Sequence, residues 1–323
     1  MPNLNHGSDR VATCCDLRRG SAIKGFIKRA IPALPGYRHL CLLLRNYGPS
    51  GMAWMERVPI APGSQVLVHS VAGDLFLSRP ERCSIAKKLF WTRGVCKPPE
   101  DRIALNLFGI VARRSEVALD IGANSGLFSL VAAKANPQIR VIAFDILPEA
   151  YHILSDNLIL NGLLDRVEVQ LVGVGKSGDV FFAPFDKVSS EMPSAVSLDM
   201  RVDGWQVRVP VKSLDEICLP RFANRRLCVK IDVEGNEASI FANGRETLTT
   251  TGPDIICEVL PTAKDLEQYD RLLSRCAYNK FLITDTGLSQ QSKIDPHKRF
   301  KDWFLTKGNC TDLVGTDLLC DYG

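Results

Sequence analysis

Residues 117–126, Val-Ala-Leu-Asp-Ile-Gly-Ala-Asn-Ser-Gly, decide the fold of this chain. The apolar residues around Asp120 predict a short buried strand, and the apolar spacing after Gly126 predicts a helix. Gly122 and Gly126 have no Cβ, so the backbone between strand and helix can approach a ligand closely. The helix N-terminus adds free N–H groups and the positive end of the helix dipole. The stretch therefore predicts a strand, a ligand-binding loop and a helix in succession.

The loop differs from the dinucleotide-binding fingerprint G-x-G-x-x-G. It holds two glycines four residues apart, Gly122 and Gly126, so it does not specify the geometry that places a pyrophosphate against the helix. A glycine-rich turn of this kind also closes strand–helix corners that bind nothing. The residues that follow the loop therefore decide how it is interpreted.

The composition is that of an ordinary globular protein. The chain has 323 residues, of which 46% are hydrophobic and 24% charged, enough for one large or two modest domains. The longest aliphatic run, residues 40–44, is too short to span a membrane, and residues 1–30 lack the apolar core of a secretory signal. The eleven cysteines contain no C-x-x-C pair and are expected to be free thiols in a reducing compartment. We therefore expect a cytoplasmic protein without a transmembrane segment.

Charge is unevenly distributed along the chain. Residues 1–60 contain nine Lys and Arg residues and three acids, whereas the net charge of the whole chain is +4. This basic N-terminal extension can meet acidic lipid or another anionic partner, or can simply be a solvated face. The aromatic residues that accompany a nucleic-acid surface are missing, so we expect no nucleic-acid partner. Residues 61–114 are expected to lead into a core domain at 115–310, and residues 311–323 to form a tail.

The repeating part of the chain alternates strands with helices. Strands are predicted at 117–121, 139–144, 167–172, 227–231 and 254–259, and helices at 126–135, 148–161, 237–248 and 263–276. This alternation is typical of an α/β fold with a parallel sheet and helices on both faces. In such sheets ligands bind beyond the carboxyl ends of the strands.

The segments around this core have less regular patterns. Before it, helices are expected at 21–30, 37–47, 85–92 and 99–113, and two short strands at 66–69 and 74–77. Residues 173–204, rich in serine and interrupted by two prolines, are expected to form a long loop or lid. A terminal hairpin is expected between 281–284 and 302–306.

Carboxylates follow successive predicted strands at Asp120, Asp145 and Asp232. Asp145 lies nineteen residues after Gly126, a spacing at which an acid at the end of the second strand can bind the two hydroxyls of a ribose. A single Asp at a strand end is often only a helix cap or a turn residue. The combination of Asp145 with the glycine loop favours a binding site.

A second dense stretch begins at Lys230 and reads Lys-Ile-Asp-Val-Glu-Gly-Asn-Glu. It crowds that lysine with Asp232, Glu234 and Glu237, which indicates a site because charges are rarely buried without partners. Oxygen ligands suit magnesium or calcium, but no histidine lies nearby and the spacing matches no calcium loop, so no metal site is assigned. Glu234 and Glu237 can also be first-turn acids that favour a helix dipole. Glu258, at the end of the fifth strand, adds an acid on the same edge.

Together these motifs resemble the FkbM-type methyltransferases, a family of class I S-adenosylmethionine-dependent enzymes. The resemblance rests on V-A-L-D-I-G-A-N-S-G, A-F-D-x-x-P, N-L-x-x-N-G, V-K-I-D-V-E-G-N-E and P-D-I-I-C-E, in this order, and spans about residues 65–306. It implies a Rossmann-like sheet of seven strands, the last one antiparallel, with S-adenosylmethionine as the cofactor. It also implies methyltransferase activity, mostly O-methylation of hydroxyls on sugars, polyketides and other small metabolites.

The resemblance also implies roles for individual residues. The methionine portion of the cofactor would be held by Asp120, Gly122, Asn124 and Gly126. Asp145 would bind the ribose hydroxyls, and Asp232 would face the methionine end near the reacting methyl group. Glu234 and Glu237 match acids beside that site and, with Asp232, are the candidate catalytic residues for removing a proton from an alcohol. Where the family has Glu-Pro after the second strand, this chain has Asp145-Ile146, with a shorter acid.

The expected function is therefore S-adenosylmethionine-dependent methylation, with a hydroxyl of a small molecule or a glycan as the acceptor. Two alternatives stay open. A nicotinamide-dependent oxidoreductase is disfavoured by the incomplete glycine fingerprint. A non-catalytic protein with this fold is disfavoured by the intact carboxylates at the strand ends, although a fold does not fix a function. The sequence is compatible with a homo-oligomer, and it assigns neither the acceptor nor the general base.

Overall fold

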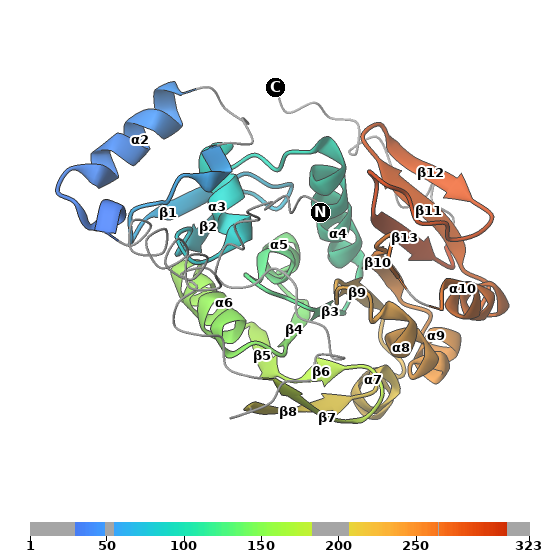
Figure 1. Ribbon diagram of the computed structural model, residues 1–323. Coiled ribbons are helices and arrows are strands. Elements are labelled where there is room, and N and C mark those ends of the chain that lie inside the picture. Colours follow the sequence, from blue (N-terminus) through green and yellow to red (C-terminus); the bar gives the residue numbers. More distant parts are fainter. Residues whose placement is uncertain (1–29, 49–54, 183–206, 264, 309–323) are drawn as a thin grey trace, which may run out of the picture.

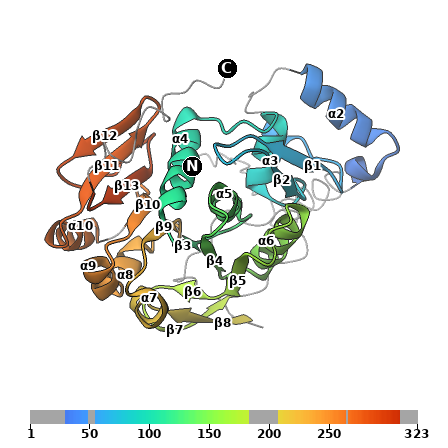
Figure 2. The ribbon, with the colours of Figure 1, turned by 180° about the vertical axis from the view of Figure 1, so that it is seen from behind.

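The computed structural model describes residues 30–48, 55–182, 207–263 and 265–308. An eight-stranded sheet forms the centre of the described chain, with helices packed on both of its faces (Figure 1, Figure 2). A two-stranded sheet and a three-stranded sheet lie outside this central sheet. Within these residue ranges, no helix is both long enough and apolar enough to cross a membrane.

The strands of the central sheet lie in the order β12-β11-β13-β10-β9-β3-β4-β5. Parallel pairing joins β3 (Val117–Ile121), β4 (Arg140–Asp145), β5 (Val167–Leu171), β9 (Leu227–Ile231) and β10 (Asp254–Glu258). The last strand, β13 (Asp302–Thr306), is antiparallel to β10 and to β11 (Asn279–Thr284), and β12 (Gly287–Gln291) closes the edge. The predicted α/β fold, Rossmann-like with an antiparallel last strand, is confirmed.

The sheet has one strand more than the resemblance implies. The strands of the expected terminal hairpin, β11 and β13, do pair antiparallel, with Phe281 opposite Phe304. Between them in the sequence lies β12, a strand that the pattern does not predict, which pairs with β11 across a tight turn. Its sequence, Gly-Leu-Ser-Gln-Gln, is mostly polar and partly exposed because an edge strand has a neighbour on one side only.

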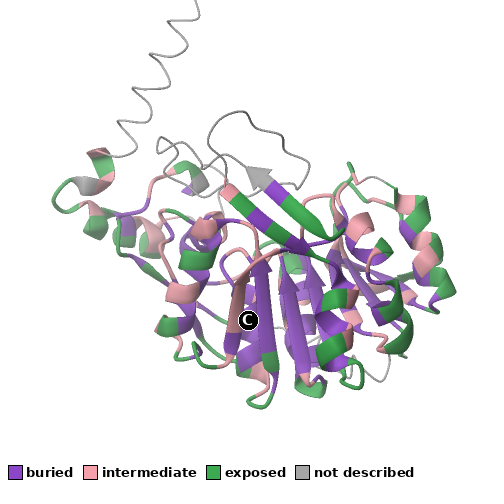
Figure 3. Ribbon diagram, turned by 90° about the horizontal axis from the view of Figure 1, so that it is seen from below, coloured by how far each residue is buried: buried purple, intermediate pink, exposed green. Residues whose placement is uncertain are grey.

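Helices cover both faces of the sheet because successive strand residues point to opposite sides. Ala118 belongs to an apolar core that includes residues of α4 (Pro99–Arg114), α5 (Leu127–Ala135) and α6 (Pro148–Leu160). Leu119 belongs to a second core with residues of α7 (Leu214–Phe222), α8 (Glu237–Ala242), α9 (Arg245–Thr250) and α10 (Leu266–Arg275). Every residue of β3 and β9 is buried, as expected for central strands covered on both sides (Figure 3).

The segments before the central sheet follow the predicted pattern closely. Strands β1 (Gln65–Val68) and β2 (Leu75–Ser78) pair antiparallel and precede α3 (Ser84–Trp91). Helix α2 (Tyr37–Tyr47), flanked by η1 (Ile31–Ala33) and η2 (Met55–Arg57), lies at the outer edge of the molecule (Figure 1). Residues 21–29 of the expected first helix, and the expected tail at 311–323, lie outside the described residues.

Residues 173–204 do not form only a loop. β6 (Gly173–Val174) and β7 (Gly178–Phe182) join β8 (Val207–Lys212) in a small sheet of order β6-β8-β7. Residues 183–206 lie outside the described residues. The sheet forms because Val180 and Val209 stand opposite each other and are both buried, while Arg208 and Pro210 on either side of Val209 are exposed. The expectation of a loop is therefore wrong for β6 and β7.

The single helix expected after β9 is two helices, α8 and α9, with a break at Gly244. Asp215, at the start of α7, accepts hydrogen bonds from the N–H groups of Glu246 and Thr247 and so begins a new helix. Gly244 packs so closely on Leu214 that a Cβ would lie 2.7 Å from the leucine Cδ2. The break results from the docking of α7, which the local pattern does not reveal.

Candidate active site

The loop after β3 passes close to the end of β9. Gly122 has φ +80°, and a Cβ on it would lie 1.8 Å from the carbonyl oxygen of Asp232, so this close passage requires glycine. The N–H groups of Gly122 and Ala123 donate to the carbonyl oxygen of Phe144 at 2.9 and 3.0 Å. The glycine loop therefore ties together the carboxyl ends of β3, β4 and β9.

Asp145 connects this loop to the end of β4. Its Oδ2 accepts a hydrogen bond from the N–H of Asn124 at 2.8 Å, and its Oδ1 accepts one from the N–H of Leu147 at 2.8 Å. Burial raises the pKa of Asp145, whereas these backbone donors oppose the rise. Because a carboxylate has about four acceptor positions, Asp145 keeps the capacity to bind the hydroxyls of a ligand.

Asp120 is held from the other side of the loop, by the first turn of α5. Its Oδ2 accepts hydrogen bonds from the N–H and the Oγ–H of Ser129, at 2.9 and 2.6 Å. Burial raises the pKa of Asp120 to about 6, although Ser129 and the charge of Lys230 favour the ionised form. Asp120 thus fixes α5 against β3.

A cavity of about 390 Å³ lies at the carboxyl ends of these strands. Its volume is within the range of small-molecule sites. The predicted site residues that line the cavity are Asp120, Gly122, Asn124, Asp145, Asp232 and Glu234. The structure also describes Gly126 and Glu237, and neither of them lines it. Gly126 instead caps α5 with φ +77°.

Glu237 is buried at the start of α8 and does not line the cavity. It begins α8 and is 1% exposed. Its Oε1 accepts a hydrogen bond from the N–H of Gly235 at 3.0 Å, and its Oε2 is buried with no hydrogen-bond partner among the described residues. Burial raises the pKa of this carboxyl. Glu237 is therefore an acid in the first turn of α8, which is the alternative interpretation that the sequence left open for it.

Part of the cavity wall comes from segments that the sequence does not link to the site. α3 contributes Ser84, Ile85 and Lys88, and Lys301 comes from the loop before β13. Residues 172–174, which follow β5, complete this wall. No local signal identifies them, because they reach the cavity through the docking of distant segments. Glu258 also lines the cavity, and its position at the end of β10 is one that the strand pattern does predict.

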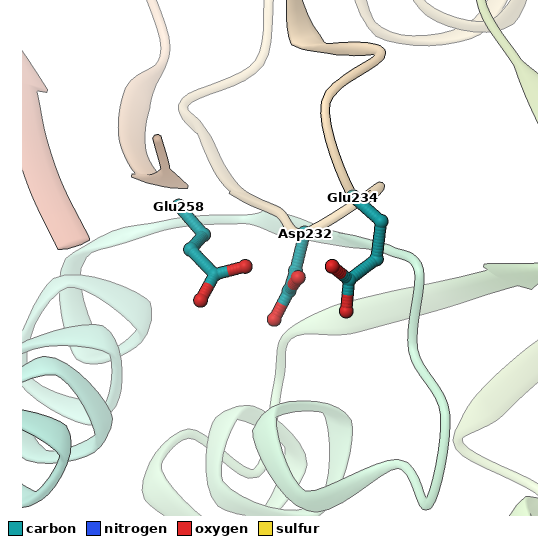
Figure 4. Close-up of side chains that lie close together, drawn as sticks. All are labelled: Asp232, Glu234 and Glu258. Carbon is teal, nitrogen blue, oxygen red and sulfur yellow. The ribbon is translucent and has the colours of Figure 1, made fainter. Parts of the chain in front are cut away.

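Carboxylates of Asp232, Glu234 and Glu258 face one another at one side of the cavity (Figure 4). One oxygen of each lies within 4.8 Å of the others. Burial, and then the charge of Asp232, raise the pKa of Glu258 well above its usual range, and Glu258 hydrogen-bonds to Asp232. The same two causes raise the pKa of Glu234. Such a group is stabilised by a shared proton or by a cation.

Lys230 supplies a buried positive charge behind these acids. Its Nζ lies 3.0 Å from Oδ1 of Asp302, 3.8 Å from Oδ2 of Asp232, and 5.1 Å from the ring centre of Phe128. Burial alone would lower the pKa of Lys230, but the charges of Asp302 and Asp232 raise it above its usual range. The lysine therefore stays protonated and places a positive charge behind the acids of the cavity.

Comparison with protein families identifies the domain that contains this cavity. Residues 120–280 match the model of the methyltransferase FkbM domain. The chain belongs to the FkbM methyltransferase family. The match begins at Asp120 and includes the glycine loop, Asp145 and the Asp232–Glu258 region. α3 and Lys301, which line the same cavity, lie outside the matched residues.

Relatives of this FkbM protein include methyltransferases of several kinds. A ribosomal protein L11 methyltransferase of Geobacter sp. (strain M21) is 26% identical over 155 residues, which are 45% of this chain and 50% of that protein. The 2-O-methyltransferase NoeI of Sinorhizobium fredii is 25% identical over 176 residues, 50% of this chain and 71% of NoeI. Methyltransferase sdnD of Sordaria araneosa is 42% identical over 59 residues, 18% of this chain and 23% of sdnD. The chain thus spans half of the L11 methyltransferase and under a quarter of sdnD.

Two of the solved structures to which this chain is similar are the following. One is an S-adenosylmethionine-dependent methyltransferase from Agrobacterium tumefaciens, with a TM-score of 0.42, 12% identity, and coverage of 77% of this chain and 72% of that one. Another is the O-methyltransferase from Bacillus cereus in complex with S-adenosylhomocysteine, with a TM-score of 0.38, 15% identity, and coverage of 65% and 80%.

S-adenosylmethionine is the cofactor of the FkbM family, so the cavity has to suit it. Ser125 lines the cavity, and its buried hydroxyl makes no hydrogen bond within the described chain beyond a weak contact with the Cys83 thiol. A polar group of the cofactor would satisfy this hydroxyl. Asp145 and Asp120 add carboxylates that suit hydroxyl and amino groups. The donors and acceptors present therefore fit the cofactor.

Proposed function

We propose that this FkbM protein transfers a methyl group from S-adenosylmethionine to a hydroxyl of a small molecule or a glycan. The observation that carries the proposal is one cavity that joins the glycine loop and Asp145 to the carboxylates of Asp232 and Glu258. The loop and Asp145 have the chemistry to hold the cofactor, and the carboxylates have the chemistry to accept a proton. The 2-O-methyltransferase name of the relative NoeI supports oxygen as the acceptor atom.

For the cofactor, we assign the ribose hydroxyls to Asp145. Its two oxygens are already aligned by the N–H groups of Asn124 and Leu147, so little side-chain freedom is lost when a ligand binds. The methionine portion is assigned to Asp120, the Ser125 hydroxyl and the backbone of the glycine loop. The cofactor, when bound, supplies an electrophilic methyl group on a sulfonium.

For the acceptor, we assign the general base to Asp232. Its side chain is 38% exposed and lines the cavity, and Nζ of Lys230 lies 3.8 Å from its Oδ2. Asp232 takes the proton of the acceptor hydroxyl as the oxygen gains the methyl group. Glu258, kept protonated, donates a hydrogen bond to Asp232 and fixes its orientation. The cavity walls align the acceptor and exclude water.

Calorimetric titration of the purified protein with S-adenosylmethionine, and separately with S-adenosylhomocysteine, tests the proposal. We expect micromolar binding of both. Asp145→Asn should weaken both by about tenfold or more, because a hydrogen bond to a charged group contributes about 1.5–3 kcal/mol. Asp165→Asn, which changes an exposed acid that does not line the cavity, is the matched control and should bind as the wild type does.

Two results would contradict the proposal. A folded protein that binds neither compound removes the methyltransferase function. Equal binding by the wild type and Asp145→Asn removes the ribose role of Asp145. Oxygen as the acceptor atom is tested by transfer of a radiolabelled methyl group to sugars and small alcohols, followed by alkali treatment, which cleaves methyl esters and leaves methyl ethers intact.

A further inference from the structure

The exposed apolar residues of the described chain are concentrated around α2. Ten large hydrophobic side chains are exposed in the described residues, and six of them lie between Ile31 and Tyr47. The most exposed of the six are Leu34, Leu40, Leu43 and Tyr47, with 58%, 49%, 55% and 84% of their surface accessible. We call these four residues the α2 surface. A contiguous exposed apolar surface on a folded protein usually marks a binding face.

The opposite side of α2 is fixed to the rest of the molecule. Cys41 is buried, and the hydroxyl of Tyr37 donates to the carbonyl oxygen of Pro59 at 2.9 Å. Nε of Arg45 donates to the carbonyl oxygen of Phe90 on α3 at 3.1 Å. Residues 40, 43 and 47 have the spacing of one helical stripe, so they project together on the free side. Helix α2 lies at the periphery, as two opposite views show (Figure 1, Figure 2).

The sequence around α2 carries only positive charge. Between Asp16 and Glu56 there is no acid, and the cations in this interval are Arg18, Arg19, Lys24, Lys28, Arg29, Arg38 and Arg45. Arg38 is exposed on α2 itself, next to His39. Apolar side chains set in a basic segment are the combination that binds an anionic lipid surface, because the leucines enter the acyl boundary and the cations meet the headgroups.

Other partners of the same surface are less well matched. A second copy of the chain would bring two acid-free basic segments together, which repel each other. Single-stranded nucleic acid binds on aromatic side chains that stack with bases, whereas the α2 surface is mainly aliphatic. We therefore propose that the α2 surface docks this protein on a membrane surface that contains anionic lipid headgroups. This inference is independent of the function proposed for the cavity.

Vesicle sedimentation with the full chain tests the docking. We expect the protein to sediment with phosphatidylcholine vesicles that contain phosphatidylserine, to bind pure phosphatidylcholine vesicles weakly, and to be released from the former by salt. Leu40→Glu/Leu43→Glu should reduce binding by at least about tenfold, because two apolar side chains no longer enter the acyl boundary and charges take their place. Ile159→Glu/Leu164→Glu, at residues that are 62% and 53% exposed elsewhere, is the matched control and should bind normally.

Folding is checked by circular dichroism and by S-adenosylmethionine binding, which the two leucine changes should leave intact. Arg38→Glu is a second variant that tests the charge alone, and it should weaken binding to the anionic vesicles only. The docking is overturned if the wild type ignores anionic vesicles, or if the leucine and control variants bind equally. It is also overturned if the leucine changes abolish a dimer seen by light scattering, or binding to an RNA oligonucleotide, without changing vesicle binding.

Discussion

The side-chain amide of Asn157, on α6, donates a hydrogen bond to the carbonyl oxygen of Ser125 in the glycine loop at 2.8 Å. The other end of the same amide, Oδ1, accepts hydrogen bonds from the N–H and the hydroxyl of Ser78 on β2, both at 2.7 Å. Asn157 is fully buried. One side chain therefore holds the glycine loop, α6 and the N-terminal strands in fixed positions relative to one another.

Asn157→Ala should destabilise the protein and weaken cofactor binding. The change leaves the Ser125 carbonyl and the Ser78 N–H without partners, at a cost of about 1–3 kcal/mol for a buried group. Asn161→Ala is the control, because Asn161 bonds both backbone groups of Phe76 on β2 and none of the glycine loop. Urea unfolding should show a loss in both variants, and calorimetry should show weaker S-adenosylmethionine binding in Asn157→Ala alone. Unchanged cofactor affinity in that variant would show that the loop keeps its shape without it.

Gly122→Ala should abolish cofactor binding, whereas Gly162→Ala should not. Both glycines have positive φ, +80° and +67°, so both substitutions pay a similar backbone strain. A Cβ at Gly122 would lie 1.8 Å from the Asp232 carbonyl oxygen, but a Cβ at Gly162 would meet nothing within 4 Å. Thermal unfolding and calorimetry of the two variants measure the difference. Similar behaviour of the pair would mean that the end of β9 moves away freely.

Lys230→Met should destabilise the protein by about 3–5 kcal/mol, because it leaves buried acids without their cation. The measurement is the free energy of unfolding in urea. Adding Asp302→Leu to this variant removes the acid that lies closest to Lys230 and should restore part of the loss. If the single change costs less than about 1 kcal/mol, the acids are neutralised by protons rather than by the lysine.

The pH dependence of stability should change in Asp120→Asn. The pKa of Asp120 is raised from 3.8 to about 6, so the folded state holds its proton more tightly than the unfolded state does. The stability that this proton contributes is fully present below pH 3.8 and is lost as the pH rises through about 6. Relative to Asp120→Asn, the wild type should therefore lose unfolding free energy across that interval. Parallel stability curves for the two proteins would contradict the raised pKa.

Asp232→Asn and Glu258→Gln should separate the roles proposed for the two acids. Removing the base at Asp232 should lower kcat by about 10²–10⁴-fold. Glu258→Gln replaces a side chain that is already neutral by another neutral donor, so its loss should stay within about tenfold. The assay is transfer of a radiolabelled methyl group to the acceptor found by screening. An equal loss in both variants would indicate that the two carboxyls act as one unit.

Much of the fold is encoded locally and could be predicted. β3 has the predicted bounds because its apolar run ends directly before the glycine of the turn. α2 has the predicted bounds because Pro35, Gly36 and Gly48 delimit it. β12 could not be predicted, since a polar edge strand has no alternation to detect. The break before α9 depends on Asp215, which comes from another helix.

The same distinction applies to the candidate site. Asp120, Asp145 and Asp232 could be grouped from sequence, because the carboxyl ends of neighbouring parallel strands meet at one edge. Lys88 and the contact between Asn157 and Ser125 could not, because they depend on how segments far apart in the chain dock. Glu237 has the local sequence pattern of a site residue, but it is hydrogen-bonded to the N–H of Gly235 and does not line the cavity.

One wall of the cavity, made by Ser84, Ile85 and Lys88 of α3, comes from outside the residues that match the family. A shortened chain that keeps only the matched residues would have its pocket open on that side. This wall and the glycine loop therefore belong to different segments of the chain. Under the proposed function, substitutions in α3 are expected to change which acceptor is admitted while the glycine loop and Asp145 stay as they are, so selectivity and methyl transfer could diverge independently in evolution and in engineering.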